Sequence, residues 1–178
     1  MDGPNLIYLD TKMSKYQILN RAKKTLSTEL LALKELSKSF NNNFYKAVSL
    51  INKTKGRIIV TGIGKSAHIG KKFAATLTST GTSSFFIHAT EASHGDLGGI
   101  KKNDCIIGIS NSGETSELGD IINFSKRFNI PLISISSNPK SSLHKNSTIG
   151  ILYKKPIEAC PLNLAPTSST TICLVISD

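Results

Sequence analysis

Five short apolar runs between residues 57 and 152 constrain the fold of this chain more than any other feature of its sequence. Each run is apolar along most of its length, which is typical of strands that are buried on both faces of a parallel sheet. The runs cover residues 57–61, 83–87, 104–110, 131–136 and 148–152, and the longer helical spans between them are 66–78 and 116–128. Strands that alternate with helices require right-handed crossovers. The sequence therefore predicts an α/β fold, with a doubly wound parallel five-stranded sheet flanked by helices.

The segment before the first run is predicted to be helical. Apolar residues recur there at steps of three and four between Ile18 and Leu36, with lysine and glutamate between them. Three asparagines at 41–43 interrupt this pattern, a second short helix follows over 44–51, and Gly56 ends it. We expect residues 1–55 to form N-terminal helices that belong to the same domain as the core at 56–178.

Composition excludes several classes of protein. The chain has 178 residues, of which 39% are hydrophobic, and this is enough for the core of one globular domain. Its longest apolar stretches fall far short of the roughly 18 residues of a membrane span, so we expect no membrane partner. The net charge is +10, but the lysines are scattered and aromatic residues make up only 6%. We therefore expect no nucleic-acid partner, and assign the excess charge mainly to solubility.

The three cysteines show neither a metal-ligand spacing nor a disulfide framework. Cys105 and Cys173 lie in apolar runs and are predicted to be core residues, whereas Cys160 lies in a polar loop. This usage indicates reducing conditions, so we expect the protein to be cytoplasmic.

Two glycine motifs follow the first run, and neither is complete. Residues 62–67, GIGKSA, match the G-x-G-x-x-A fingerprint of dinucleotide sites, between a strand and a helix as that fingerprint requires. The fingerprint also needs an acid at the end of the second strand, where this chain has His88. A P-loop needs a glycine at position 59, which is Ile59. The residues therefore disfavour a nucleotide, and we expect no cofactor.

A polar loop after the third run has the composition of an anion site. Residues 110–117, SNSGETSE, bring four hydroxyls, an amide and a glycine together directly before a helix. Backbone N–H groups at a helix start favour an anion, and hydroxyls such as those of Ser112 and Thr115 complete a phosphate cradle without adding charge. The alternative is a plain helix cap, for which one hydroxyl is enough.

At this loop the sequence resembles the SIS (sugar isomerase) domain, and three further strings are similar to the D-arabinose 5-phosphate isomerases within that family. The strings are residues 61–70 (TGIGKSAHIG), 91–98 (EASHGDLG) and 158–171 (EACPLNLAPTSSTT), and the likeness runs from about Gly56 to the end. It departs from the family at Ala67 and Gly99, where many members have glycine and methionine. Members usually continue with a longer final helix, a late histidine and often two CBS modules, so we expect the final helix here to be truncated.

The resemblance implies an activity and a site. Members interconvert D-ribulose 5-phosphate and D-arabinose 5-phosphate through an enediolate, in the 3-deoxy-D-manno-octulosonate (Kdo) branch of lipopolysaccharide synthesis. They form homotetramers and need no cofactor and no metal, although the residue matching His88 can take up an inhibitory zinc ion. The implied catalytic residues are Lys65, His94, Glu117 and Glu158. The implied substrate-binding residues are Gly64, Ser66, His88, His94, Ser110, Asn111, Ser112 and Thr115.

Isomerisation requires a base, a donor to the carbonyl oxygen and a phosphate anchor. Glu158 begins a loop with two prolines, which could hold a carboxylate rigidly, but the residues alone do not distinguish it from a surface acid. The resemblance makes it the preferred base, with Glu117 as the other candidate. Lys65 would bind the phosphate or polarise the carbonyl. Two alternatives stay open: a non-catalytic SIS module that senses a sugar phosphate, which would not need both carboxylates, and a SIS isomerase that acts on another phosphosugar.

Overall fold

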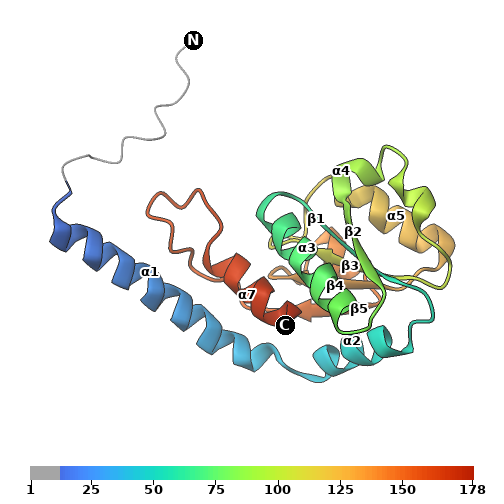
Figure 1. Ribbon diagram of the computed structural model, residues 1–178, viewed down its shortest axis with the longest axis horizontal. Helices are drawn as coiled ribbons and strands as arrows, with labels where there is room; N and C mark the ends of the chain where they lie inside the picture. Colours follow the sequence, from blue (N-terminus) through green and yellow to red (C-terminus); the bar gives the residue numbers. More distant parts are fainter. Residues whose placement is uncertain (1–12) are drawn as a thin grey trace, which may run out of the picture.

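The sheet at the centre of the molecule is parallel throughout. In the computed structural model, which describes residues 13–178, five strands lie in the order β2-β1-β3-β4-β5 (Figure 1). They are β1 Ile58–Gly62, β2 Ser84–His88, β3 Cys105–Ile109, β4 Leu132–Ser136 and β5 Ile149–Leu152. Each strand lies within one of the predicted runs or ends one residue beyond it. The fold class predicted from the sequence is therefore confirmed.

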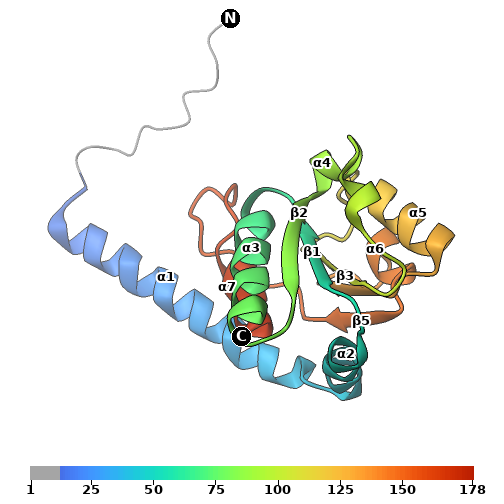
Figure 2. The ribbon, with the colours of Figure 1, turned by 45° about the vertical axis from the view of Figure 1, so that its right-hand side comes forward.

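Helices cover both faces of the sheet, as a doubly wound fold requires (Figure 2). On one face the core includes residues of α1 (Lys15–Leu36), α2 (Asn42–Lys53), α3 (Gly64–Ser79) and α7 (Ser168–Ser177). On the other face it includes residues of α4 (Ala89–Ala92), α5 (Leu118–Phe128) and α6 (Ser142–Lys145). Two short 3-10 helices, η1 (Ser37–Ser39) and η2 (Asp96–Gly99), complete the elements. Val60 of β1 packs on the first face and Ile59 on the second, which explains why the strands are apolar along their whole length.

Both N-terminal helices begin at polar caps. Ser14 and Gln17 form a capping box, in which Ser14 Oγ accepts from Gln17 N at 3.2 Å and Gln17 Oε1 accepts from Ser14 N at 2.8 Å. The second helix begins because Asn41 Oδ1 accepts from Asn43 N at 2.8 Å. The predicted interruption at 41–43 is therefore the start of α2. Residues 1–12 of the predicted N-terminal region lie outside the described residues.

The first helix, α1, runs away from the body of the molecule (Figure 1). Its carboxyl-terminal residue Leu36 is buried in the core. Six large apolar side chains along the rest of the helix are exposed: Tyr16, Ile18, Leu19, Leu26, Leu30 and Leu31. Exposed large apolar side chains in this number on one helix are typical of a protein–protein contact. None of the helices in the described part of the chain is both long and apolar enough to cross a bilayer.

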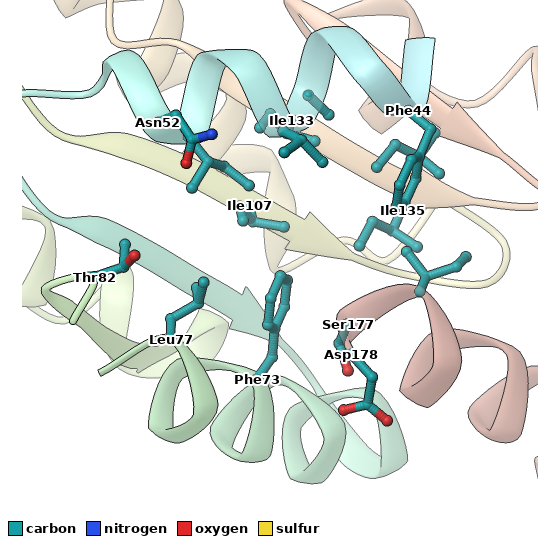
Figure 3. Close-up of a pocket in the computed structure, with 15 residues that line it drawn as sticks. Phe44, Asn52, Phe73, Leu77, Thr82, Ile107, Ile133, Ile135, Ser177 and Asp178 are labelled. Carbon is teal, nitrogen blue, oxygen red and sulfur yellow. The ribbon is translucent and has the colours of Figure 1, made fainter. Parts of the chain in front are cut away.

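A cavity of about 210 Å³ opens on the face of the sheet that α2, α3 and α7 cover (Figure 3). Phe44 of α2 and Phe73 of α3 line its walls, Ile107 and Ile133 form part of its floor, and Asp178 lies at its rim. The lining includes none of the predicted site residues. The cavity is therefore separate from the predicted site.

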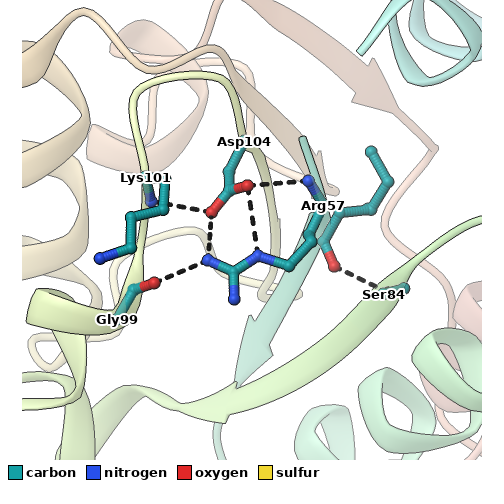
Figure 4. A network of polar contacts seen from close by, with 6 residues as sticks. Arg57, Ser84, Gly99, Lys101 and Asp104 are labelled. Carbon is teal, nitrogen blue, oxygen red and sulfur yellow. Dashed lines mark hydrogen bonds and ion pairs between the residues drawn. The ribbon is translucent and has the colours of Figure 1, made fainter. Parts of the chain in front are cut away.

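A buried ion pair joins the amino ends of β1 and β3 (Figure 4). Asp104 is 2% exposed, and its carboxylate accepts from Arg57 Nη2 at 2.8 Å and from the backbone N–H groups of Arg57 and Lys101 at 2.7 and 2.8 Å. The same Nη2 donates to the Gly99 carbonyl at 2.7 Å. Burial alone raises the pKa of Asp104, but these donors outweigh it and the pKa is lowered. The pair ties the loop before β3 to the start of β1.

Candidate functional site

Most of the predicted site residues come from loops that follow strands. Because the sheet is parallel, the carboxyl ends of its strands meet at one edge, where Gly62 of β1 pairs with His88 of β2 and with Ile109 of β3. The chain passes from β1 to β2 on one side and from β3 to β4 on the other, so the direction of winding reverses between β1 and β3. Ligands of open α/β sheets bind at such a reversal. The loops at 63–66 and 110–117 both leave the sheet at this point.

The loop after β3, residues 110–117, is called the hydroxyl loop below. Ser110 Oγ lies 2.8 Å from Thr115 Oγ1 and 3.5 Å from Ser112 Oγ, and it accepts from the Gly113 N–H at 3.0 Å. Ser110 is buried, Thr115 is half-buried and Ser112 is exposed. The structure therefore brings the predicted hydroxyls together, with Ser110 holding the loop in shape and Ser112 open to a ligand.

Contacts to the segment after β4 hold the hydroxyl loop in place. The Gly113 carbonyl accepts from Leu143 N at 3.1 Å, and Glu114 Oε1 accepts from Ser142 N at 2.9 Å. Gly113 has a φ of +68°, and a Cβ at this position would overlap the side chain of Ser141. Only glycine combines this backbone conformation with so close an approach at little cost. The loop is therefore shaped before any ligand arrives.

The hydroxyls of the loop do not cap the helix that follows. We expected a helix over 116–128, but α5 begins at Leu118, and the Leu118 N–H donates to the Thr115 carbonyl at 3.1 Å. Within residues 13–178 no side chain caps the start of α5. Thr115 Oγ1 is directed to Ser110 instead. The structure therefore excludes the alternative in which a hydroxyl of this loop caps the helix.

Asn111 is held by a residue that the sequence analysis missed. Tyr153, directly after β5, donates its hydroxyl to Asn111 Oδ1 at 3.0 Å, and the same hydroxyl lies 3.6 Å from Cys173 Sγ of α7. The Asn111 carbonyl accepts from Ser137 N at 3.0 Å and from Ser137 Oγ at 2.8 Å. A tyrosine after an apolar run is ordinarily a core residue, and only its position at the carboxyl edge of the sheet could have indicated this contact.

The loop after β1 carries Gly64, Lys65 and Ser66. The helix begins at Gly64, two residues before the predicted start, and Gly64 has a φ of +58°. Lys65 is exposed and Ser66 is half-buried in this first turn. A Cβ on Gly62, which ends the neighbouring strand, would lie 3.0 Å from the Ile109 carbonyl. The close approach of β1 and β3 thus brings the start of α3 next to the hydroxyl loop.

Glu117 follows β3 and His88 ends β2, both at the carboxyl edge of the sheet, whereas His94 lies in a separate turn. Glu117 is exposed, and its Oε2 accepts from Ser116 Oγ at 2.8 Å. Its own backbone N–H, the Ser116 hydroxyl and the charge of His88 together lower the pKa of Glu117. His94 is exposed between α4 and η2, where its N–H donates to the Glu91 carbonyl at 2.9 Å.

Glu158 lies at the start of α7. Its Oε2 accepts from Thr167 N at 2.7 Å, from Thr167 Oγ1 at 3.0 Å and from Ser169 N at 3.3 Å. Burial raises the pKa of Glu158, but the donors from Ser169 and Thr167 outweigh it and lower the pKa. We expected prolines to hold this carboxylate, but the N-terminal N–H groups of α7 do so. Its charge also contributes to the raised pKa of Tyr153, after burial and the nearby Cys173, so Glu158 lies near the tyrosine that contacts the hydroxyl loop.

The cysteines and potential metal ligands are spread over the molecule. Cys105 and Cys173 are buried, which confirms their prediction as core residues, and Cys160 is partly exposed. Within the described residues, no three His, Cys, Asp or Glu side chains gather where they could hold a metal ion. The inhibitory zinc at His88 stays a prediction.

Comparisons with known proteins agree on one family. The family model described as SIS domain matches residues 50–178. The arabinose 5-phosphate isomerase KdsD of Francisella tularensis is 52% identical over 163 residues, which are 90% of this chain and 50% of the relative. The KdsD of Pseudomonas aeruginosa is 48% identical over 160 residues, which are 90% of this chain and 49% of the relative. The chain thus spans about half the length of the curated relatives it matches.

Among solved structures, that of an E. coli CFT073 protein in complex with arabinose 5-phosphate is similar to this chain. Its TM-score is 0.88, its sequence is 38% identical, and the match covers 93% of this chain and 88% of that chain. The resemblance inferred from the sequence strings is therefore confirmed by both kinds of comparison.

Proposed function

The chain belongs to the SIS-domain family, and we propose that it binds a phosphorylated pentose and interconverts D-ribulose 5-phosphate and D-arabinose 5-phosphate. The observation that carries this proposal is the hydroxyl loop, in which the hydroxyls of Ser110, Ser112 and Thr115 cluster at the point where the sheet winding reverses. The curated relatives are arabinose 5-phosphate isomerases, which supports D-arabinose 5-phosphate as the sugar.

The phosphate is proposed to bind over the hydroxyl loop. Ser112 and Thr115 donate hydroxyl groups, Asn111 donates from its amide, and Lys65 contributes positive charge from the neighbouring helix start. Neutral donors suit this task, because they bind the dianion without neutralising the carboxylates that the chemistry needs. Gly64 and Ser66, in the first turn of α3, complete the cradle with backbone and hydroxyl donors.

The reaction moves a proton between adjacent carbons. Starting from the ketose, a base removes a proton from C1, the electron pair of that bond forms a double bond between C1 and C2, and the carbonyl oxygen on C2 becomes negatively charged. The oxygen on C2 then takes up a proton, O1 loses its proton and C2 is protonated, which leaves the aldehyde at C1 and a hydroxyl at C2. Lys65, His88 or His94 would stabilise the oxygen anion of the enediolate by donating to it.

Glu158 is our proposed base. Its Oε2 accepts from Thr167 N, Thr167 Oγ1 and Ser169 N, and we propose that Oε1 receives the substrate proton. The lowered pKa keeps the carboxylate ionised at neutral pH, as a base must be, and burial by a bound sugar would raise this pKa toward the working range. Glu117, exposed beside His88, is proposed as the second proton carrier.

The cellular setting follows from the family. We propose a cytoplasmic homotetramer that needs no cofactor and supplies D-arabinose 5-phosphate to Kdo and lipopolysaccharide synthesis. The exposed apolar residues of α1 support assembly, because a second copy would remove them from water.

The decisive experiment is incubation with D-ribulose 5-phosphate in the presence of EDTA, with arabinose 5-phosphate measured by NMR. We expect conversion by the wild type, and loss of conversion in Glu158→Gln. Glu35→Gln on α1 is the matched control, because it removes one carboxylate charge outside the site. Calorimetric binding of the sugar phosphate without any turnover would favour the sensing alternative. Conversion of a different phosphosugar in place of the pentose would favour the other alternative, a SIS isomerase that acts on another phosphosugar.

A further inference from the structure

Tyr153 is a buried side chain whose polar end reaches the candidate site. The residue is 3% exposed, and its ring belongs to the core on the face covered by α7. Its backbone N–H donates to the Ser136 carbonyl at 3.1 Å, which fixes the residue against the end of β4. Its hydroxyl donates to Asn111 Oδ1 at 3.0 Å, across 42 residues of chain. A ring packed in the core therefore aims one hydrogen bond at the hydroxyl loop.

Asn111 has its backbone and its side chain held by different strands. Ser137, which follows β4, donates two hydrogen bonds to the Asn111 carbonyl, and Tyr153, which follows β5, donates to the side-chain oxygen. The tyrosine occupies Oδ1, so the two N–H donors of Nδ2 stay available to a ligand. Asn111 is half-buried and directly precedes the exposed Ser112 in the hydroxyl loop.

The orientation of this amide decides the sign of its interaction with an anion. Rotation by half a turn about the last side-chain bond would exchange Nδ2 with Oδ1 and present an acceptor oxygen to the phosphate. An acceptor facing a dianion repels it, whereas an N–H group donates a charge-assisted hydrogen bond. The hydroxyl of Tyr153 donates to the amide oxygen from the core side, which favours the orientation with the N–H groups toward the ligand before the ligand binds.

We propose that Tyr153 is a positioning residue, which fixes the Asn111 amide so that its N–H groups face the phosphorylated ligand. The inference rests on the proposed function, because it takes the ligand of the hydroxyl loop to be a sugar phosphate. Burial, Cys173 and the charge of Glu158 raise the pKa of Tyr153, so its hydroxyl stays protonated as a donor at neutral pH.

The test is a double-mutant cycle between Tyr153→Phe and Asn111→Ala, with D-arabinose 5-phosphate as the ligand in titration calorimetry. Tyr153→Phe removes the hydroxyl and keeps the ring. We expect it to weaken binding about three- to tenfold, the range of one net hydrogen bond. In the Asn111→Ala background the same change is expected to have no further effect on affinity. A purely structural role would lower affinity by the same factor in both backgrounds.

Two control variants separate the hydrogen bond from packing. Cys173→Ala removes the other neighbour of the Tyr153 hydroxyl, and Ser125→Ala removes a buried hydroxyl that donates to the Ile130 carbonyl at 2.7 Å, outside the site. Both are expected to bind the ligand as the wild type does.

Asn111→Asp tests the orientation without touching the buried tyrosine. It keeps an oxygen for Tyr153 but turns the free donor into a second oxygen, so we expect weaker binding than in Asn111→Ala. Equal binding by wild type and Tyr153→Phe, equal factors in both backgrounds, or wild-type affinity in Asn111→Asp would each overturn the inference alone. A wild type that binds no sugar phosphate would overturn the proposed function, and the inference with it.

Discussion

Replacing Gly113 with alanine would strain the hydroxyl loop in two separable ways. The residue has a φ of +68°, which a non-glycine residue adopts at a cost of about 1–2 kcal/mol. A Cβ here would also overlap Oγ and Cβ of Ser141. Ser141 is fully buried, and its hydroxyl accepts from His144 N at 3.2 Å and donates to the Asn138 carbonyl at 2.8 Å. It therefore cannot move aside without losing the cap of α6.

Gly81 supplies a matched control for the backbone strain. Its φ is +94°, and a Cβ there would meet nothing within 4 Å, so alanine at this position adds strain without overlap. Overpacking adds about 1–3 kcal/mol to the backbone cost, which gives about 2–5 kcal/mol for Gly113→Ala against about 1–2 kcal/mol for Gly81→Ala. At about 2–4 °C per kcal/mol, we expect Tm to fall by roughly 4–20 °C in Gly113→Ala and by roughly 2–8 °C in Gly81→Ala.

Thermal unfolding by circular dichroism measures both effects, and calorimetry with D-arabinose 5-phosphate measures the site. We expect Gly113→Ala to bind the ligand more weakly, because the loop must shift, and Gly81→Ala to bind it as the wild type does. Adding Ser141→Gly relieves the overlap, so the double variant should be more stable than the sum of the two single changes. Equal losses of Tm at both glycines, together with unchanged affinity in Gly113→Ala, would refute the reasoning.

Three further predictions concern the anchor, the base and the ion pair. Ser112→Ala combined with Thr115→Ala should weaken binding of any phosphorylated ligand by about tenfold or more in calorimetry, since two donors to a dianion are lost. Glu158→Gln should abolish turnover in the isomerase assay and leave ligand affinity nearly intact, because glutamine keeps an oxygen for the N–H groups of α7. Asp104→Asn should lower the free energy of unfolding by about 2–4 kcal/mol in urea at pH 7, below the full cost of breaking a buried pair because Arg57 is partly exposed. The folded state lowers the pKa of Asp104, so its contribution is complete above about pH 4 and is lost as pH falls through the folded value.

Each of these predictions has a contrary outcome. Unchanged affinity in the hydroxyl variant would move the phosphate anchor elsewhere, and full turnover in Glu158→Gln would exclude this residue as the base. Asp120→Asn, at a carboxylate in the first turn of α5, is the matched control for Asp104→Asn. Equal unfolding free energies and equal acid sensitivity in these two variants would contradict the role given to the ion pair.

The strands could be predicted from the sequence because burial on both faces leaves a continuous apolar run. The starts of the helices could not be predicted as well, because they depend on single contacts. α5 begins at Leu118 since the Thr115 hydroxyl turns to Ser110, and α3 begins at Gly64, which takes a positive φ. The periodicity of the apolar residues predicts neither of these two helix starts.

The loops of the candidate site were predictable from strand order, but the contacts within and between them were not. The rule that carboxyl ends share one edge brings the two glycine-containing loops together without any structure. The support of Glu158 by Thr167 and Ser169, and of Asn111 by Tyr153, joins residues whose spacing has no sequence signature. Tyr153 in particular has the composition signal of a core residue, which it also is.

The ion pair of Arg57 and Asp104 and the hydroxyl loop lie at opposite ends of the same two strands, about 17 Å apart for strands of this length. Mutations that alter what the loops recognise therefore leave the pair untouched. A directed-evolution library confined to exposed positions of residues 110–117, with Gly113 kept, can therefore vary ligand recognition without breaking the ion pair that supports the other end of the sheet. Ligand recognition and this contribution to stability thus lie at opposite ends of β1 and β3.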